Sequence, residues 1–354
     1  MKNLFLKKII EIPGISGREE KISKHIEEIL VSYDLDIVRD NNGSIYGYKK
    51  SEQKNAPVVM VDAHMDEVGF IVTKIEDNGI LRLEAMGGIS KFSIANSRLR
   101  VWSDNPTKSF AGTLFFKEPQ TDVQKKQPIP AIKDMMFDIG AVDKKQVQKE
   151  FELNIGNVVT FDYPSEQNGD RVIAKSLDDR AGVAILLETL DFIKNTSFDY
   201  DIYIGASSQE EVGLRGARTS AYKINPDLAI VVDVSPSNDL PTDEQTGTLG
   251  KGTILRHKDS CYLTDKYIIK YIRDLSTKHN IKIQDYFGTG CTNAGILHLS
   301  NNGIKTIPLG LLARGLHTGS SIIDMNDYEE TKKLLKEVLT DLNIKTINKI
   351  KGNT

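Results

Sequence analysis

The segment that decides the fold is Ala56–Phe70, with the sequence APVVMVDAHMDEVGF. Its nearly continuous apolar run, Val58–Ala63, predicts a strand buried on both faces, which is typical of a sheet covered by helices. The run ends at His64 and Asp66, and from about residue 67 the pattern changes to short alternating segments. This stretch therefore predicts both an α/β sheet and the place where a different structure begins.

The alternating segments continue from about residue 67 to residue 163. Turn signals such as Asp77-Asn78-Gly79 separate them, which predicts a β-rich domain built as a small barrel with one short helix near DKKQVQKEF. The loop KEPQTDVQKKQPIP within this domain is expected to be exposed. The alternating segments are GFIVTKI, GILRLEAM, SRLRVWS, FAGTLFF and NVVTFDY.

Helical patterns occupy both flanks of this β-rich part. In the first 40 residues a helix is expected to restart after Pro13-Gly14, with Ser16 as its N-cap and Glu19 completing a capping box. After Ser176, helical segments such as DDRAGVAILLETLDFIK and CTNAGILHLSNN alternate with apolar strands. We therefore predict an α/β fold with a mixed, mainly parallel sheet covered by helices on both faces, formed by residues 1–66 and 166–354, with residues 67–165 inserted as the barrel.

Composition narrows the possible partners and compartment. A net charge of −3 with scattered Lys and Arg gives no support for nucleic-acid binding. The apolar residues of the N-terminus are interrupted by Lys7 and Lys8, so we expect an amphipathic helix and not a signal peptide. With no apolar run of the roughly 18 residues that span a membrane, a cytoplasmic protein without a membrane partner is expected. Cys261 and Cys291 are each expected to be small buried residues, as in a reducing compartment.

Acidic and imidazole groups follow several of the predicted strands. Ligands of open α/β sheets bind outside the carboxyl ends of the strands, so these groups are expected to meet at one edge. Taken singly, each His could be structural, and Asp178 could be a helix cap. Together they would repel strongly without a counter-ion, because Lys175, Arg180 and Arg215 could neutralise only part of the charge. The groups are His64, Asp66, Asp178, Glu210, Glu211, Asp233 and His317.

Metal ions account for this set better than a purely structural role. Two histidines and three carboxylates without a Cys cluster are the ligands of hydrolytic zinc or cobalt centres, and a bridging carboxylate would let them hold two ions. In QEEVG (209–213), one glutamate is then a ligand and the other a general base, in an order that the residues leave open. Asp66 is suited to accept the second N–H of His64.

Five blocks along the chain resemble the tetrahedral (TET) aminopeptidases, which are metal-dependent exopeptidases. The resemblance is closest to their bacterial glutamyl aminopeptidase branch and spans nearly the whole chain, including the place of the inserted domain. It implies a PDZ-like inserted domain and a homododecamer whose active sites face an internal chamber. The blocks, in order, are DAHMDEVGF, SLDDRAGVA, QEEVGLRGA, VVDVSP and ARGLHT.

The resemblance implies a role for each site residue. His64 and Asp233 would complete one metal site, Glu211 and His317 the other, and Asp178 would bridge them. Glu210 would be the general base, and Asp66 the partner of His64.

The implied enzyme is a dinuclear metalloaminopeptidase with two divalent ions per subunit, zinc or cobalt. It would release N-terminal Glu or Asp, and possibly other residues, from short peptides. Metal-bound hydroxide would attack the scissile carbonyl after Glu210 takes the proton.

Three positions bear on substrate preference. The family commonly has Gly-Thr-Asp-Ala where this chain has CTNAG, so Asn293 replaces a carboxylate near the expected substrate pocket. The segment FKEPQ (116–120) also lacks the Pro-Pro-His of many relatives. A missing negative charge would favour an acidic side chain, for which Arg256 is either a partner or an ordinary surface residue.

Other functions remain open from the sequence. A deacylase or a carboxypeptidase could use the same metal core. An endoglucanase, a label given to some members of this branch, would need Glu210 and Glu211 roughly 5–9.5 Å apart and no metal. An aromatic content of 7% with a single Trp offers little surface for stacking sugars. A non-catalytic scaffold is hard to reconcile with the presence of all expected ligands and the base.

Overall fold

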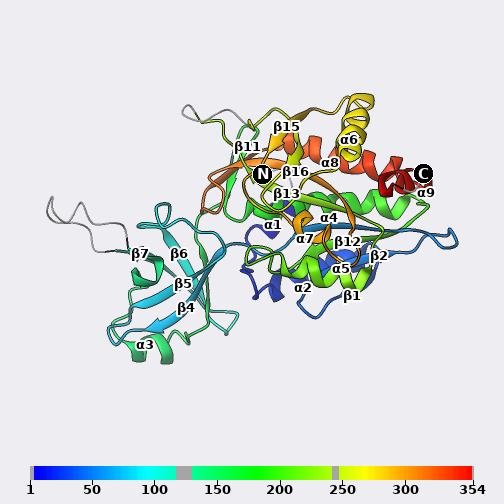
Figure 1. Cartoon of the computed structure of the whole chain (residues 1–354). Helices are drawn as coiled ribbons and strands as arrows, with labels where there is room; N and C mark the ends of the chain where they lie inside the picture. The colour runs from blue at the N-terminus through cyan, green and yellow to red at the C-terminus, as the bar shows by residue number, and fades with distance from the viewer. Residues whose placement is uncertain (1–3, 117–129, 241–246, 353–354) are drawn as a thin grey trace.

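The computed structural model describes residues 4–116, 130–240 and 247–352. Within these residues, a nine-stranded mixed sheet with flanking helices and a closed six-stranded antiparallel barrel form two separate bodies of the chain (Figure 1). Every barrel strand lies between Gly69 and Phe161. The predicted α/β fold with a small inserted barrel is therefore confirmed. Most of the loop that was expected to be exposed, and FKEPQ after Phe116, lie outside the described residues.

Parallel pairing occupies the centre of the sheet. The strand order is β1-β2-β12-β3-β13-β16-β17-β11-β10, in which β12, β3, β13 and β16 run parallel and the pairs toward both edges are antiparallel. The strands are β1 (Asp36–Arg39), β2 (Ile45–Lys49), β3 (Val58–His64), β10 (Glu166–Asn168), β11 (Arg171–Ala174), β12 (Asp201–Ser207), β13 (Leu228–Pro236), β16 (Lys305–Arg314) and β17 (Ser321–Asp324).

The barrel has a hydrophobic core of its own. Phe70, Leu83, Val101 and Phe137 are fully buried inside it and belong to no cluster of the large sheet. Its strands follow the order β4-β5-β8-β7-β6-β9. The elements are β4 (Gly69–Ile75), β5 (Leu81–Met86), β6 (Arg98–Trp102), β7 (Ser109–Phe115), the short 3₁₀ helix η2 (Ile132–Asp134), β8 (Met136–Asp138), α3 (Lys144–Lys149) and β9 (Val158–Phe161).

Helices cover both faces of the sheet, which explains the apolar run of β3. Val59 and Val61 face the core that includes α4, whereas Met60 faces the opposite core with Ala217 and Ala221 of α5. A separate parallel pair, β14 (Thr253–Lys258) and β15 (Ile283–Phe287), lies beside this sheet. The helices are α1 (Leu4–Ile9), α2 (Glu20–Ser32), α4 (Leu177–Asn195), α5 (Arg215–Ile224), α6 (Lys266–Lys278), α7 (Ala294–Leu297), α8 (Met325–Asp341) and α9 (Ile344–Lys351).

The predicted capping box at Ser16 is wrong. Helix α2 begins only at Glu20, and its N-cap, Glu19, makes no capping hydrogen bond with its side chain. The Ser16 hydroxyl instead donates to Asp66 Oδ2 at 2.6 Å, and Glu19 Oε1 accepts from the amide of Gly17 at 2.8 Å. The same oxygen of Glu19 also accepts from the distant amide of Gln209 at 3.0 Å, so tertiary contacts engage both side chains that a local helix start would have used.

Two other helical segments are shorter than predicted. Residues 36–39, expected to be helical, form β1 because they pair with β2 at the sheet edge. In CTNAGILHLSNN only Ala294–Leu297 is an α-helix, and the residues after it form turns.

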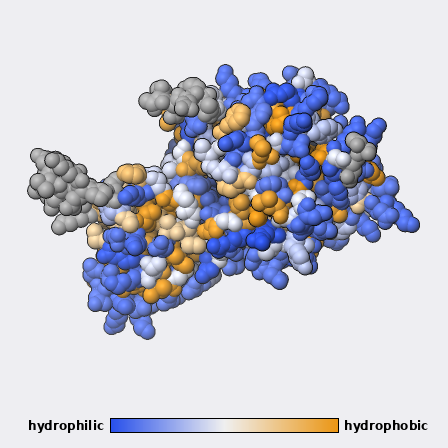
Figure 2. Space-filling model, viewed as in Figure 1, coloured by the Kyte–Doolittle hydropathy of each residue, from blue (hydrophilic) through white to orange (hydrophobic). Residues whose placement is uncertain are grey.

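In the view of Figure 2 the surface of the α/β domain is mostly hydrophilic. The clearest apolar patches lie over the barrel strands and around the middle of the molecule.

None of the helices in the described part of the chain combines the length and apolar character that a membrane-spanning helix requires.

Candidate active site

A cavity of about 400 Å³ opens at the carboxyl ends of β3, β12, β13 and β16. The register of the parallel strands β3 and β13 brings two of these side chains together. Val231 pairs with Asp62, so Asp233 and His64, each two residues further along its strand, lie at the same level. Asp66, the remaining predicted residue, is completely buried next to the cavity. The predicted side chains that line the cavity are His64, Asp178, Glu210, Glu211, Asp233 and His317.

The carboxylate of Asp178 lies between two imidazoles. Its Oδ1 is 3.0 Å from Nε2 of His64, and its Oδ2 is 3.2 Å from Nε2 of His317. Asp178 and Asp179 precede the regular part of α4 and have non-helical backbone angles. The capping contact belongs to Asp179, whose Oδ1 accepts from the amide of Gly182 at 3.0 Å. Asp178 is thereby left to face both histidines with different oxygens.

The other acidic groups divide between the two histidines. Nε2 of His64 is 3.9 Å from Asp233 Oδ1 and 3.9 Å from Glu210 Oε2. Nε2 of His317 is 3.2 Å from Glu211 Oε1. Two groups of potential metal-ligand atoms lie mutually within 4.8 Å, and both contain His64 and not His317: His64 with Glu210 and Asp233, and His64 with Asp178 and Glu211.

Backbone carbonyl oxygens lie within hydrogen-bond distance of Nδ1 of both imidazoles and fix the orientation of the rings. Nδ1 of His64 is 3.1 Å from the carbonyl oxygen of Asp66 and 3.5 Å from its carboxylate, and Nδ1 of His317 is 3.0 Å from the carbonyl oxygen of Gly88. A carbonyl can only accept, so each Nδ1 donates and each Nε2 is turned toward the cavity. Gly88 follows β5 of the barrel, and no feature of the sequence pointed to it.

Two carboxylates hold the turn that carries Glu210 and Glu211. Asp66 Oδ1 accepts from the amide of Glu210 at 3.0 Å, and Asp66 Oδ2 accepts from the amide of Glu211 at 3.2 Å. Glu19 Oε1 accepts from the preceding amide, that of Gln209, at 3.0 Å. Three consecutive amides therefore donate to buried carboxylates, which fixes where both glutamate side chains begin.

Burial and mutual repulsion shift the pKa values of the cluster. Burial, followed by the charge of Asp178, raises the pKa of Asp233 to about 8. Burial also raises the pKa of Glu210 well above its ordinary value, although His64 partly opposes the shift. Burial alone would lower the pKa of His317, but hydrogen bonds to Asp178 and Glu211 raise it to about 11. Without a metal ion, the cluster therefore retains protons at neutral pH.

The nearby basic side chains do not neutralise this cluster. Lys175 Nζ contacts Glu67 Oε2 at 2.8 Å, away from the cavity lining. Arg180 is fully buried and donates to backbone carbonyls, including that of Met65 at 2.7 Å. Arg215 is exposed at the start of α5. Among the residues that line the cavity, the two imidazoles and Arg256 are therefore the basic groups that face these carboxylates, and a bound cation would supply the charge that they leave uncompensated.

The donor set fits divalent metal ions. Two imidazole nitrogens and several carboxylate oxygens, without thiolates, suit zinc or cobalt. Glu211 Oε1 is buried and lies 3.2 Å from Nε2 of His317, and no other donor of the described residues reaches it. Such an oxygen is satisfied when it ligates a cation.

Arg256 is a buried residue of the cavity wall and not a surface residue. It is 2% exposed, and its Nη1 is 3.2 Å from Oδ2 of Asp259. Its guanidinium carbon lies 5.6 Å from the ring centre of Tyr286, and its Nε has no hydrogen-bond partner among the described residues. One wall of the cavity therefore presents a cation whose donors are incompletely used.

Asn293 lies next to the cavity, since Thr292 belongs to its lining, but Asn293 itself does not line it. It is 1% exposed and donates through Nδ2 to Asp62 Oδ2 at 2.8 Å and to Ser207 Oγ at 2.7 Å. Burial raises the pKa of Asp62 to about 7, and hydrogen bonds from Tyr46, Ser207 and Asn293 oppose that rise. Asn293 thus stabilises a buried carboxyl group and does not contact the substrate space.

The two cysteines are also not separate buried residues. Cys261 and Cys291 form a disulfide with a Cα–Cα distance of 5.2 Å, and both line the cavity. The pairing could not be read from two cysteines 30 residues apart, because it depends on the parallel strands β14 and β15 that precede them.

We predict that loading the metal-free protein with Zn²⁺ or Co²⁺ releases protons. Metal ligands must be deprotonated, whereas Asp233 and His317 hold protons below their pKa values of about 8 and about 11, so affinity should keep rising with pH from neutrality through this range. Isothermal titration in two buffers of different ionisation enthalpy measures the proton release, and its repetition at several pH values measures the change in affinity. Metal affinity that is independent of pH, with no proton released near pH 7, would contradict this account of the cluster.

Comparisons with known proteins show which family the chain belongs to. The model of the family described as M42 glutamyl aminopeptidase matches residues 43–334. The glutamyl aminopeptidase of Lactococcus lactis subsp. cremoris (strain MG1363) is 33% identical over 350 residues, or 98% of each chain.

Two solved structures of peptidases are similar to this chain over nearly its whole length. Aminopeptidase APDkam598 from the archaeon Desulfurococcus kamchatkensis has a TM-score of 0.93 at 29% identity, covering 99% of this chain and 97% of that one. The Pyrococcus horikoshii TET1 peptidase, which can assemble into a tetrahedron or a large octahedral shell, has a TM-score of 0.84 at 26% identity, covering 95% and 98%. The chain therefore belongs to the M42 glutamyl aminopeptidase family and is a metal-dependent aminopeptidase.

Proposed function

We propose that this aminopeptidase is dinuclear and prefers peptides that begin with Glu or Asp. Two observations carry the proposal: Asp178 lies between two imidazoles, and the buried cation Arg256 lines the same cavity. The first feature supports two neighbouring ions with a shared carboxylate. The second supports an acidic side chain at the substrate's N-terminal residue.

In this proposal His64 and Asp233 hold one ion and Glu211 and His317 hold the other, with Asp178 shared. The distances from Asp178 to the two histidines, 3.0 and 3.2 Å, support the sharing, because each oxygen already faces a different imidazole. Two bound divalent ions would polarise the scissile carbonyl and make water a nucleophile near neutral pH.

Glu210 is the proposed general base. It lines the cavity, and its Oε2 is 3.9 Å from His64 Nε2, whereas Glu211 contacts His317 at 3.2 Å. Glu211 therefore suits the role of ligand and leaves Glu210 free to accept a proton. Burial favours the protonated form of Glu210, so the proton can be retained until it passes to the leaving amine.

Asp66 is the proposed positioning residue of the base. Its two carboxylate oxygens accept from the amides of Glu210 and Glu211, and its carbonyl oxygen lies behind His64. One buried residue thus contacts a proposed ligand on one side and the proposed base on the other. A rigid turn of this kind reduces the motion that proton transfer would otherwise have to overcome.

The preference for acidic residues rests on Arg256. A carboxylate in the cavity would be attracted by the positive charge of the guanidinium in its wall, whereas a Lys side chain there would face a like charge. Asp259 Oδ2 and Ser235 Oγ already accept from the two terminal nitrogens of the guanidinium, and together they fix its plane. The replacement of a carboxylate by Asn293 does not contribute, because Asn293 lies outside the cavity.

A homododecamer is the proposed assembly, supported by the likeness to the P. horikoshii TET1 peptidase and its tetrahedral form. We expect native mass spectrometry to give a mass close to twelve times 39.5 kDa, because twelve copies complete the tetrahedron that the resemblance implies. A monomer or dimer as the only species at micromolar concentration would contradict the assembly without affecting the assignment of the site.

Glu210→Gln should abolish turnover while leaving metal binding intact, because the amide cannot accept the proton but fills the same space. We expect kcat to fall by roughly 10²–10⁴-fold for a Glu-anilide substrate. Metal content, measured by mass spectrometry of the elements, should match that of the unmodified protein.

Glu211→Gln is the matched control on the neighbouring residue. It should lower the metal content, because it removes a proposed ligand. If Glu210→Gln retained its activity, or if it lost metal as Glu211→Gln does, the assignment of the base would be wrong.

Arg256→Met should reduce kcat/KM for a Glu-anilide by roughly 10–100-fold, the contribution of a lost hydrogen bond to a charged group. Turnover of a Leu-anilide should change by less than about twofold, because an apolar side chain does not use the guanidinium. Lys258→Met, on the same strand but exposed, is the matched control. Equal losses on both substrates would indicate a general disturbance of the cavity and would refute the proposed preference.

A further inference from the structure

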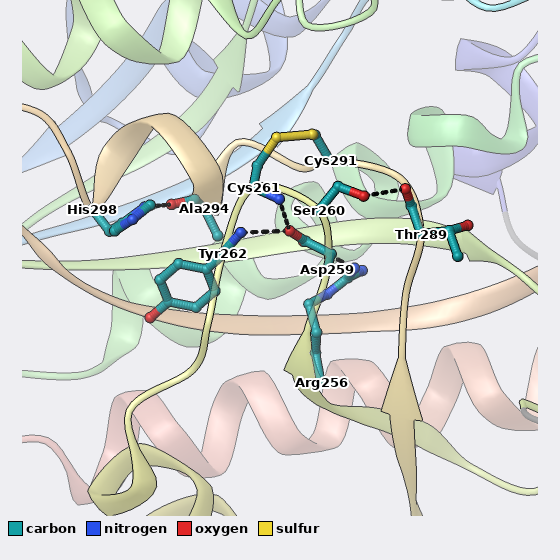
Figure 3. Close-up of a disulfide and its surroundings, with 9 residues drawn as sticks. All are labelled: Arg256, Asp259, Ser260, Cys261, Tyr262, Thr289, Cys291, Ala294 and His298. Carbon is teal, nitrogen blue, oxygen red and sulfur yellow. Dashed lines mark hydrogen bonds and ion pairs between the residues drawn. A yellow bond between two sulfur atoms is a disulfide. The ribbon is translucent and has the colours of Figure 1, made fainter.

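The Cys261–Cys291 disulfide joins two loops that form one wall of the cavity. The loops follow β14 and β15, which lie side by side, and the two Cα atoms are 5.2 Å apart (Figure 3). Hydrogen bonds run alongside the covalent link. The amide of Ser260 donates to the carbonyl oxygen of Gly290 at 3.0 Å, its hydroxyl donates to that of Thr289, and the amide of Gly288 donates to that of Lys258 at 2.8 Å.

Cys261 also determines the position of the carboxylate that orients Arg256. Oδ1 of Asp259 accepts from the amide of Cys261 at 2.8 Å and from that of Tyr262 at 2.7 Å. Oδ2 of the same carboxylate is 3.2 Å from Arg256 Nη1 (Figure 3). Asp259 is 5% exposed, so water does not compete strongly for this pair. The carboxylate of Asp259 thus links the backbone amide of Cys261 to the guanidinium of Arg256.

The loop that carries the second cysteine rests on the same ion pair. A Cβ added at Gly288 would lie 3.1 Å from Arg256 Nη1 and 3.3 Å from the Cβ of Asp259. On the other side, a Cβ at Gly295 would lie 2.5 Å from the Cβ of Cys261, so helix α7 packs directly against that cysteine. The disulfide therefore joins Cys291, in the loop that packs on the guanidinium, to Cys261, which packs against α7.

Without the disulfide, few contacts would hold this loop in place. Thr289, Gly290 and Cys291 are exposed, and each of the three hydrogen bonds named above is weak where water competes for its partners. Most of the surrounding core would remain, because the buried residues of β14, Ile254 and Leu255, do not depend on the link. Loss of the disulfide should thus loosen the wall without unfolding the domain.

From these contacts we infer that the disulfide is a specificity-determining element, which keeps Arg256 oriented toward an acidic side chain of the substrate. This inference rests on the proposed preference for Glu and Asp. Cys261 and Cys291 act through Asp259 and Gly288 and touch neither the proposed metal ligands nor Glu210 in any contact of the described residues. Breaking the link should accordingly change substrate affinity and not the chemical step.

The link can be broken reversibly. A thiolate of a small dithiol attacks one sulfur, the other cysteine leaves as a thiolate, and the second thiol of the reagent closes its own disulfide. Two protein thiols and one oxidised reagent result, with no change at the metal centre. Cys291 is exposed in the cavity wall, so the reagent has access to it.

The test compares a Glu-anilide and a Leu-anilide before and after reduction of the metal-loaded protein with a phosphine, which avoids chelation by a dithiol and takes its oxygen from water. We expect KM for the Glu-anilide to rise roughly tenfold, the value of one hydrogen bond to a charged group. The kcat value, the metal content and the KM for the Leu-anilide should stay within about twofold, and reoxidation should restore the original KM.

Replacement of both cysteines tests the same inference without a reductant. Cys261→Ser/Cys291→Ser should behave as the reduced chain and be insensitive to the phosphine, which also excludes thiol ligation of the metal as the cause. Thr289→Ala is the matched control, because its side chain makes no hydrogen bond among the described residues and only its carbonyl accepts from Ser260.

The outcomes separate the two proposals. An untreated protein with no preference for Glu over Leu would refute the acidic preference itself. A clear preference that survives both reduction to two titratable thiols and the double substitution would refute only the role of the disulfide. Equal increases of KM on both substrates, or a fall in kcat with loss of metal, would show a general structural role and would also overturn this inference.

Discussion

The contact between Asp178 and two imidazoles is the constraint on which the rest of the site depends. Several carboxylates are buried within one cavity, and burial of unpaired carboxylates is strongly unfavourable. Asp178 relieves part of this cost because each of its oxygens faces a different histidine, at 3.0 and 3.2 Å. The remaining deficit of positive charge is what a pair of divalent ions would supply.

Several elements of the fold position the residues of this contact. The parallel centre of the sheet ends in His64 and Asp233, the segment after β16 carries His317, and the irregular start of α4 turns Asp178 toward them. The barrel participates as well, since the carbonyl of Gly88 orients His317. The inserted domain is therefore structurally connected to the site and is not merely attached to the sheet.

Much of the fold and of the site's composition could be predicted from the sequence. Continuous apolar strands indicated a sheet covered on both faces, and the edge rule for such sheets identified five of the six predicted side chains that line the cavity, whereas Asp178 was identified at a helix start. These inferences succeeded because each depends on a local pattern, the end of a strand or the start of a helix, that is visible in a short segment.

What could not be predicted depends on contacts between distant segments. Ser16 bonds to Asp66 across 50 residues, and the two cysteines meet only because β14 and β15 are neighbours. The burial of Arg256 and the placement of Asn293 against Asp62 follow from packing that no single segment contains. The Ser16 capping box failed for the same reason, since a tertiary partner engaged the serine hydroxyl.

The central claim is that Asp178 is shared by two metal ions. Its most direct test is a crystal structure of the metal-loaded protein, with anomalous scattering recorded at the absorption edge of the bound metal. The account predicts two anomalous peaks per chain, roughly 3.5–4 Å apart, with one oxygen of Asp178 next to each. A single peak under saturating metal, or two peaks that Asp178 does not contact, would contradict it.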